Sequence, residues 1–117
     1  MATIVDARAV RAGLERSYEV VVRGHVKFRV GSIVFVAFSR DEQIMGFGFP
    51  KEQRDGLVNS EPDKFQLPRA SDMRYNWVVV HLDAIDAQEL RELVEEAWAM
   101  VVPKKVSKPY FDALPQE

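Results

Sequence analysis

The most constraining feature of this 117-residue sequence is a stretch of short strand patterns that runs from residue 25 to residue 49. In its first part the period is two, with valines and a phenylalanine on one side and His25, Lys27 and Arg29 on the other. This alternation predicts a strand with one buried and one wet face. Gly31-Ser32 suits a two-residue type II′ turn. Consecutive strands joined by such turns predict an antiparallel sheet.

The strands that follow have two further features. Residues 33–38 are all apolar, so we expect a central strand that is covered on both faces. In residues 43–49, Gly46 and Gly48 share one face, which permits the close approach of something bulky, most simply a helix. Residues 18–22 also read as extended, and residues 76–82 return to strand.

Three segments have the pattern of amphipathic helices. The first follows Thr3 or Asp6 as a cap, and the second follows Pro50 over residues 51–58. The third begins at a capping box formed by Asp86 and Glu89, shows one apolar stripe over residues 90–101, and ends before a proline.

These elements predict a two-layer α+β fold, in which helices cover an antiparallel sheet. We expect a single domain over residues 1–103 and a C-terminal tail over residues 104–117. The lysines that open the tail would complement the negative end of the preceding helix dipole.

Composition excludes several classes of protein and site. The chain has no cysteine, which excludes disulfides, thiolate metal sites and cysteine nucleophiles and is compatible with a reducing cytosol. The longest apolar run, residues 33–38, is far shorter than the ~20 residues of a membrane span, and no secretory signal opens the chain. We therefore expect a cytoplasmic protein with no membrane partner.

The sequence contains no catalytic or cofactor-binding motif that we can identify. His81 stands two residues before Asp83, but we expect this pair to finish a strand, because no nucleophile or third ligand accompanies it. Gly46-Phe47-Gly48-Phe49 partly echoes the RNA-recognition-motif signature, and we expect its phenylalanines to be core residues. The sequence thus predicts a protein that is not an enzyme and has no cofactor or metal.

Charge is unevenly distributed, although the net charge is only −2. Residues 8–40 hold seven lysines and arginines against two glutamates, whereas residues 83–96 hold six acidic residues against one arginine. Such runs can be two solvated faces, or a dipolar molecule whose basic side meets a polyanion. A basic strand face also protects a sheet edge from pairing. The candidate nucleic-acid-binding residues are His25, Lys27, Arg29, Arg69, Arg74, Lys104 and Lys105.

Several short motifs between residues 28 and 105 occur in a recognisable order and spacing. They are Phe28-Arg29-Val30-Gly31, Pro50-Lys51-Glu52, Glu61-Pro62-Asp63-Lys64-Phe65, Asn76-Trp77-Val78-Val79-Val80, Glu89-Leu90-Arg91-Glu92-Leu93, Glu96-Ala97-Trp98 and Val102-Pro103-Lys104-Lys105. In these motifs the chain resembles the MmcQ/YjbR family of small bacterial proteins. It departs from the family at residues 14–17, which lack the family's Leu-Pro-Gly-like turn.

The resemblance implies an α-β-β-β-α-β-β-α domain like that of bacterial secretion chaperones. Members of the family are commonly described as DNA-binding proteins, and the resemblance brings no catalytic residues with it. Two functions follow as hypotheses: a non-enzymatic DNA-binding module that uses the basic strand face, or a protein-interaction or chaperone-like module. The second would present the sheet face or the aromatic pair Tyr110-Phe111 to its partner.

Overall fold

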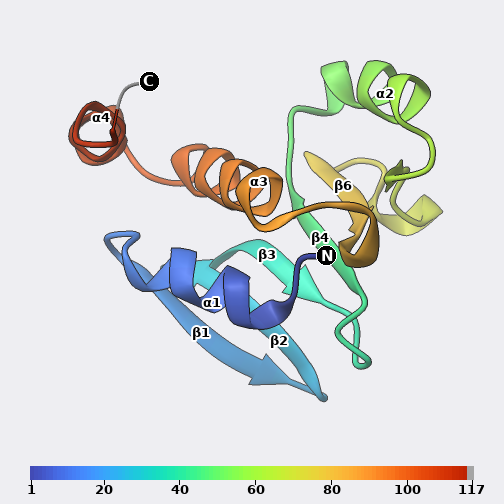
Figure 1. Cartoon of the computed structure of the whole chain (residues 1–117), viewed down its shortest axis with the longest axis horizontal. Helices are drawn as coiled ribbons and strands as arrows, with labels where there is room; N and C mark the ends of the chain where they lie inside the picture. Colours follow the sequence, from blue (N-terminus) through green and yellow to red (C-terminus); the bar gives the residue numbers. More distant parts are fainter. Residues whose placement is uncertain (116–117) are drawn as a thin grey trace.

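A computed structural model describes residues 1–115, which form an α+β fold with an antiparallel sheet (Figure 1). The α-helices and strands in these residues are α1 (Ile4–Ala12), β1 (Ser17–Val22), β2 (His25–Val30), β3 (Ile33–Phe38), β4 (Ile44–Gly48), α2 (Lys51–Ser60), β5 (Phe65–Gln66), β6 (Trp77–His81), α3 (Ala87–Ala99) and α4 (Lys104–Asp112). Two short 3₁₀ helices, η1 (Ala70–Asp72) and η2 (Leu82–Ala84), flank β6. The strand order in the sheet is β1-β2-β3-β4-β6-β5. The predicted fold class is confirmed.

The helices begin where the sequence indicates. Thr3 and Asp6 form a capping box, because the Thr3 hydroxyl accepts from the Asp6 amide and the Asp6 carboxylate accepts from the Thr3 amide. At α3, the Asp86 carboxylate accepts from the Glu89 amide at 2.8 Å. The Glu89 carboxylate is 3.1 Å from Lys64 Nζ, so the α3 cap has one of the two expected bonds.

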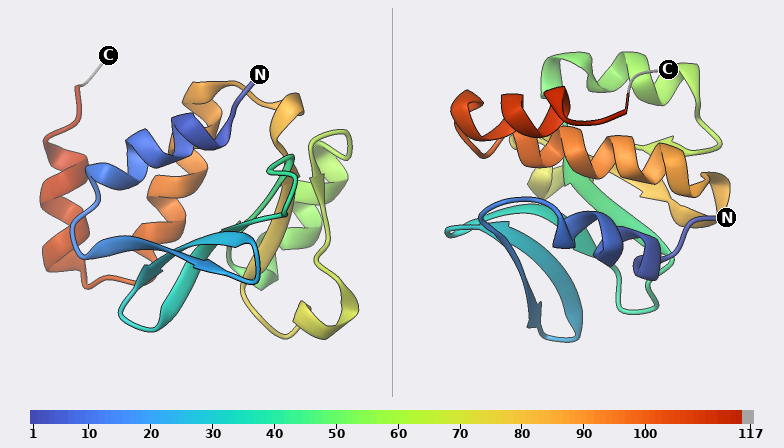
Figure 2. Two further views of the ribbon diagram at one scale, coloured as in Figure 1. Left: turned by 90° about the horizontal axis from the view of Figure 1, so that it is seen from below. Right: turned by 60° about the vertical axis from the view of Figure 1, so that its left-hand side comes forward.

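The core lies between one face of the sheet and helices α1 and α3, which pack against each other (Figure 2). The apolar stripe of α3 is buried here, since Leu90, Val94, Ala97 and Trp98 have no exposed surface. On the sheet, Phe28, Phe38 and Phe47 are at most 1% exposed. Phe47 is therefore a core residue, as expected, whereas Phe49 is half-buried and packs against the core from its edge.

Strand β3 is not covered on both faces, which corrects the prediction from its apolar run. Phe35 and Val36 are fully buried, whereas Val34 and Ala37 are half-buried. The reason is a β-bulge: Phe28 pairs with Val36 and Arg29 with Val34, which leaves Phe35 as an extra residue. The bulge lets two neighbouring side chains enter the same core, so an apolar run does not require cover on the second face.

The structure contains two elements, β1 and α4, beyond the α-β-β-β-α-β-β-α order that the resemblance implies. β1 precedes β2 and is joined to it by Arg23 and Gly24, whose φ values of 53° and 82° define a type I′ turn. Residues 104–112, which the sequence analysis places in a tail, form α4. The ring of Tyr110 is 5.1 Å from that of Trp98 on α3, so packing explains why the helix forms there.

The lysines at positions 104 and 105 lie in the first turn of α4 rather than at the end of α3. Their expected role in complementing the α3 dipole is therefore wrong. A new helix begins after Pro103 because the fixed φ of proline, −64° here, suits a helix start. Two cations at a positive helix end oppose the dipole, so α4 depends on its packing against α3.

Candidate nucleic-acid interface

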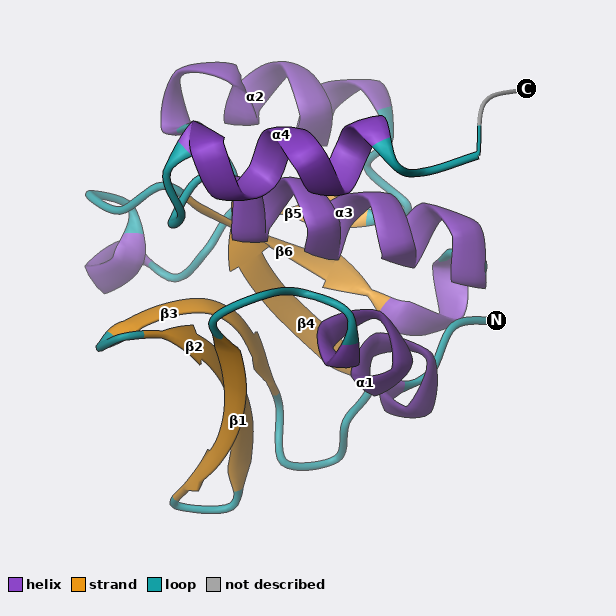
Figure 3. Ribbon diagram, turned by 90° about the vertical axis from the view of Figure 1, so that its left-hand side faces the viewer, coloured by secondary structure: helices purple, strands orange, loops and turns teal. Residues whose placement is uncertain are grey.

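One face of the sheet carries no helix over β1, β2 and β3 in the part of the chain that the structure describes (Figure 3). We call it the open face. The strand pairing assigns to it the residues Tyr18, Val20, Val22, His25, Lys27, Arg29, Val34, Ala37, Ile44, Gly46, Gln66, Trp77, Val79 and His81. Apart from Lys27 and Arg29, the set holds apolar residues, Gly46, Tyr18, Gln66 and two histidines, and none of these strand positions carries a carboxylate.

The basic residues of β2 lie on the open face with little internal compensation. Lys27 and Arg29 are half-buried, and neither has a carboxylate within 4 Å among residues 1–115. The buried Nε of Arg29 has no hydrogen-bond partner within the same residues. His25 differs, because its Nδ1 lies 2.9 Å from the carbonyl oxygen of Phe38 and thereby joins β2 to β3. Lys27 and Arg29 are therefore the cations available to an external anion.

A flat aromatic side chain completes the open face. The indole of Trp77 lies across Gly46, where an added Cβ would be 2.5 Å from Nε1 and 2.7 Å from two ring carbons. Lys27, Ala37 and Gly46 lie in one row across three neighbouring strands. Two strand spacings, or about 10 Å, separate Lys27 from Gly46, and only the small Ala37 stands between them.

The two glycines of β4 thus accommodate different groups. A Cβ on Gly48 would be 3.7 Å from the Cβ of Ala97 on α3, an ordinary contact, so a helix does approach there. At Gly46 the bulky group is the Trp77 indole rather than a helix. The alternating glycines indicated that a bulky group lies close to β4, but the sequence did not identify the Trp77 indole as that group.

The other four predicted cations come from different elements. Arg69 forms an ion pair with Asp72 at 3.0 Å, and the Arg74 guanidinium lies 4.8 Å above the ring of Tyr75. Both arginines lie between β5 and β6, whereas Lys104 and Lys105 are exposed on α4. Of the seven candidates, the strand register brings together only the three from β2.

His81 and Asp83 do not form a pair. The Nε2 of His81 lies 2.9 Å from Oε1 of Gln66, and a 3₁₀ turn over residues 82–84 breaks the alternation that would align the two side chains. A shallow pocket of about 160 Å³ is lined by Asp83 and the chain start but not by His81. This geometry removes the arrangement on which acid–base chemistry at His81 would depend.

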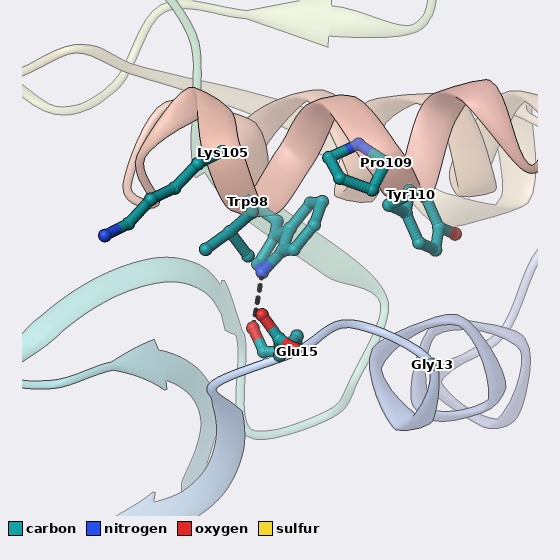
Figure 4. A pocket seen from close by; sticks show the side chains of 7 residues that line it. Gly13, Glu15, Trp98, Lys105, Pro109 and Tyr110 are labelled. Atoms are coloured by element: carbon teal, nitrogen blue, oxygen red, sulfur yellow. Dashed lines mark hydrogen bonds between the residues drawn. The ribbon is translucent and has the colours of Figure 1, made fainter.

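A second hollow, of about 320 Å³, lies where α4 meets α3 and the loop after α1 (Figure 4). The Nε1 of Trp98 donates to the carbonyl oxygen of Glu15 at 2.9 Å in its wall. Beside it the Tyr110 hydroxyl donates to Glu95, a carboxylate that is buried in α3. Burial, with this hydrogen bond, raises the pKa of Tyr110 to about 12, so the phenol stays neutral and its role is to hold α4.

No group of three or more histidine or acidic side chains in residues 1–115 could hold a metal ion. No helix among the described residues has the length and apolar character that crossing a bilayer requires.

Comparison with known proteins identifies the family. The chain is similar to Deinococcus radiodurans protein DR2400, whose crystal structure contains domain DUF419, with a TM-score of 0.76 and 23% identity over 98% of this chain and 91% of that chain. This likeness shows a shared fold. No curated protein matches the sequence. The YjbR family model matches residues 5–100, and the chain therefore belongs to the YjbR family.

Proposed function

We propose that this protein is a non-enzymatic nucleic-acid-binding module and that the open face of the sheet is its contact surface. The observation that supports this most is the chemistry of that face: Lys27 and Arg29 lack acidic partners in residues 1–115, and Trp77 lies flat on the same face. Uncompensated cations attract phosphates, and aromatic side chains stack on bases.

The shape of the face favours a single strand over a duplex. A helix or a two-stranded ribbon enters the major groove of DNA, but a broad sheet does not fit there. A single strand can lie along such a sheet, with its bases on aromatic side chains and its phosphates on cations. The row from Lys27 through Ala37 to Gly46 offers a phosphate contact and a base platform with no large side chain between them.

The test is a fluorescence titration with a single-stranded oligonucleotide at several salt concentrations. Each phosphate contact on a single strand contributes about 0.7 to the slope of log K against log salt. The double variant Lys27→Ala/Arg29→Ala should therefore lower that slope by about 1.4 and weaken binding at 0.1 M salt roughly 20-fold. Duplex of the same sequence should bind more weakly than the single strand.

The matched control is Lys104→Ala/Lys105→Ala, which removes the same charge from exposed positions on α4. It should leave affinity within about twofold, because general attraction by the whole molecule is weak at net charge −2. If both double variants weaken binding equally, the open face is not the contact surface. Binding no stronger than that of a neutral protein would end the proposal.

A protein partner is the second candidate, favoured by a different property of the same face. Val20, Val22, Val34 and Val79 are half-buried there rather than covered. Apolar side chains at the centre of a surface with a polar rim are typical of protein interfaces. Binding of a protein partner that does not depend on salt concentration, and that is lost in the Val20→Lys variant, would support this second role.

A further inference from the structure

The two edges of the sheet are unequal, and this difference leads to an inference that does not depend on the ligand of the open face. The β5 edge is only two residues long and is flanked by Pro62 and Pro68, which cannot donate to a neighbouring strand. The β1 edge is six residues long, contains neither proline nor lysine, and pairs with β2 without a bulge. One edge is protected against pairing and the other is not.

The hairpin geometry shows which backbone groups of β1 point outward. In the two-residue turn, Val22 and His25 form the closing pair, and the Val22 carbonyl accepts from the His25 amide. Hydrogen-bonded pairs then alternate along the ladder, so Tyr18, Val20 and Val22 bond to β2. The N–H and C=O groups of Glu19 and Val21 point away from the sheet, and no backbone partner meets them within residues 1–115.

The side chains at this edge are exposed and apolar. Val21 is 64% exposed and Tyr18 is 40% exposed, although both lie in a regular strand. Glu19 is the one charged residue of β1, and it already forms an ion pair with Arg8 on α1 at 3.0 Å. A second strand laid along β1 would thus meet free backbone groups, apolar side chains and a compensated charge.

We propose that β1 pairs antiparallel with β1 of a second copy of this chain and forms a homodimer with a continuous sheet. The direction of the outward groups restricts the possible registers. Pairing centred on Glu19 would place two like charges opposite each other, which is unfavourable. Pairing centred on Val21 would place Glu19 opposite Arg23 of the second copy, but Arg23 lies in the turn and outside the strand.

Pairing centred on Val20 avoids both problems and uses every residue from Tyr18 to Val22. It places Glu19 opposite Val21 of the second copy, so that both residues exchange backbone hydrogen bonds. On the open face it places Tyr18 opposite Val22 and Val20 opposite its own copy. The edge is therefore self-complementary in hydrogen bonding, in charge and in apolar contact, as a two-fold interface requires.

The experiment is sedimentation velocity over a dilution series from about 1 µM to about 1 mM, a range that brackets a weak interface. The wild-type mass should rise from 13.4 kDa towards twice that value with concentration. Val21→Pro should remain monomeric, because it removes an outward amide and no bond to β2. Val21→Glu is a second variant in case the proline variant does not fold, because it places a carboxylate opposite Glu19 of the second copy. Ile33→Lys, an exposed apolar residue of β3, is the control and should dimerise like wild type.

Amide hydrogen exchange gives a second readout that tests the register. The amides of Glu19 and Val21 should exchange rapidly in dilute protein and slow at least tenfold at the highest concentration. The amides of Val20 and Val22 should be protected at both concentrations because they bond to β2. A chain that stays monomeric throughout, even if an added extended peptide binds β1, overturns the proposal. So does a dimer that persists in the Val21 variants.

Discussion

Gly46→Ala tests whether the position of Trp77 depends on the absence of a side chain at residue 46. An added Cβ would be 2.5 Å from Nε1 of the indole, well inside van der Waals contact, so the rigid ring must move off the sheet. Overpacking of this kind typically costs about 1–3 kcal/mol. We expect the free energy of unfolding in urea to fall by about 2 kcal/mol, with an unchanged m-value.

The matched control is Gly48→Ala, two residues further along the same strand. Its added Cβ would meet Ala97 at 3.7 Å, and neither glycine has a positive φ. The gain from restricting the unfolded chain should then leave the Gly48→Ala variant as stable as wild type, or more stable by about 0.4–1 kcal/mol. Equal effects of the two substitutions would refute the argument, because the difference rests entirely on Trp77.

Two other predictions concern buried polar groups. The buried guanidinium of Arg54 donates to the carbonyl oxygens of Met73, Tyr75 and Trp77 at 2.8–3.2 Å, so Arg54→Met should destabilise the protein by about 2–3 kcal/mol in urea unfolding, and an effect below about 0.5 kcal/mol would contradict this. Tyr110→Phe should cost about 1–2 kcal/mol at neutral pH in thermal unfolding, because the buried Glu95 carboxylate loses the hydroxyl and keeps only Arg91, at 3.5 Å. The folded-state pKa of Tyr110, about 12, lies above its ordinary value of 10.0, so its contribution to stability is complete below pH 10 and is lost between pH 10 and 12. In that interval wild type should lose more stability than Tyr110→Phe, and parallel pH profiles would show that Tyr110 is not the group concerned.

The candidate site could be predicted from the sequence only in part. The alternation in residues 25–30 predicted correctly that Lys27 and Arg29 leave the core face of β2. It did not show that Arg69 would pair with Asp72, or that Arg74 would lie over Tyr75. These partners are near in sequence, but the irregular segment that holds them has no period from which side-chain directions follow.

The position of Trp77 is a second feature of the site that local sequence patterns could not predict. The strand that contains Trp77 was predicted from residues 76–82, and the glycines of β4 indicated that something lies close to them. That the indole lies on Gly46 depends on the register between β4 and β6, which are separated by α2 and a long loop. No local pattern specifies that register.

What the sequence determined by itself is the type of most elements and the face that each one buries. Periodicity, helix caps and turn residues act over a few neighbouring residues, so they can be read without knowing the partners. Only the tertiary structure decided the bulge that turns Phe35 inward, the helix that residues 104–112 form against Trp98, and the grouping of the cations. Each of these depends on which distant residues pack together, and such contacts form only when the whole chain folds.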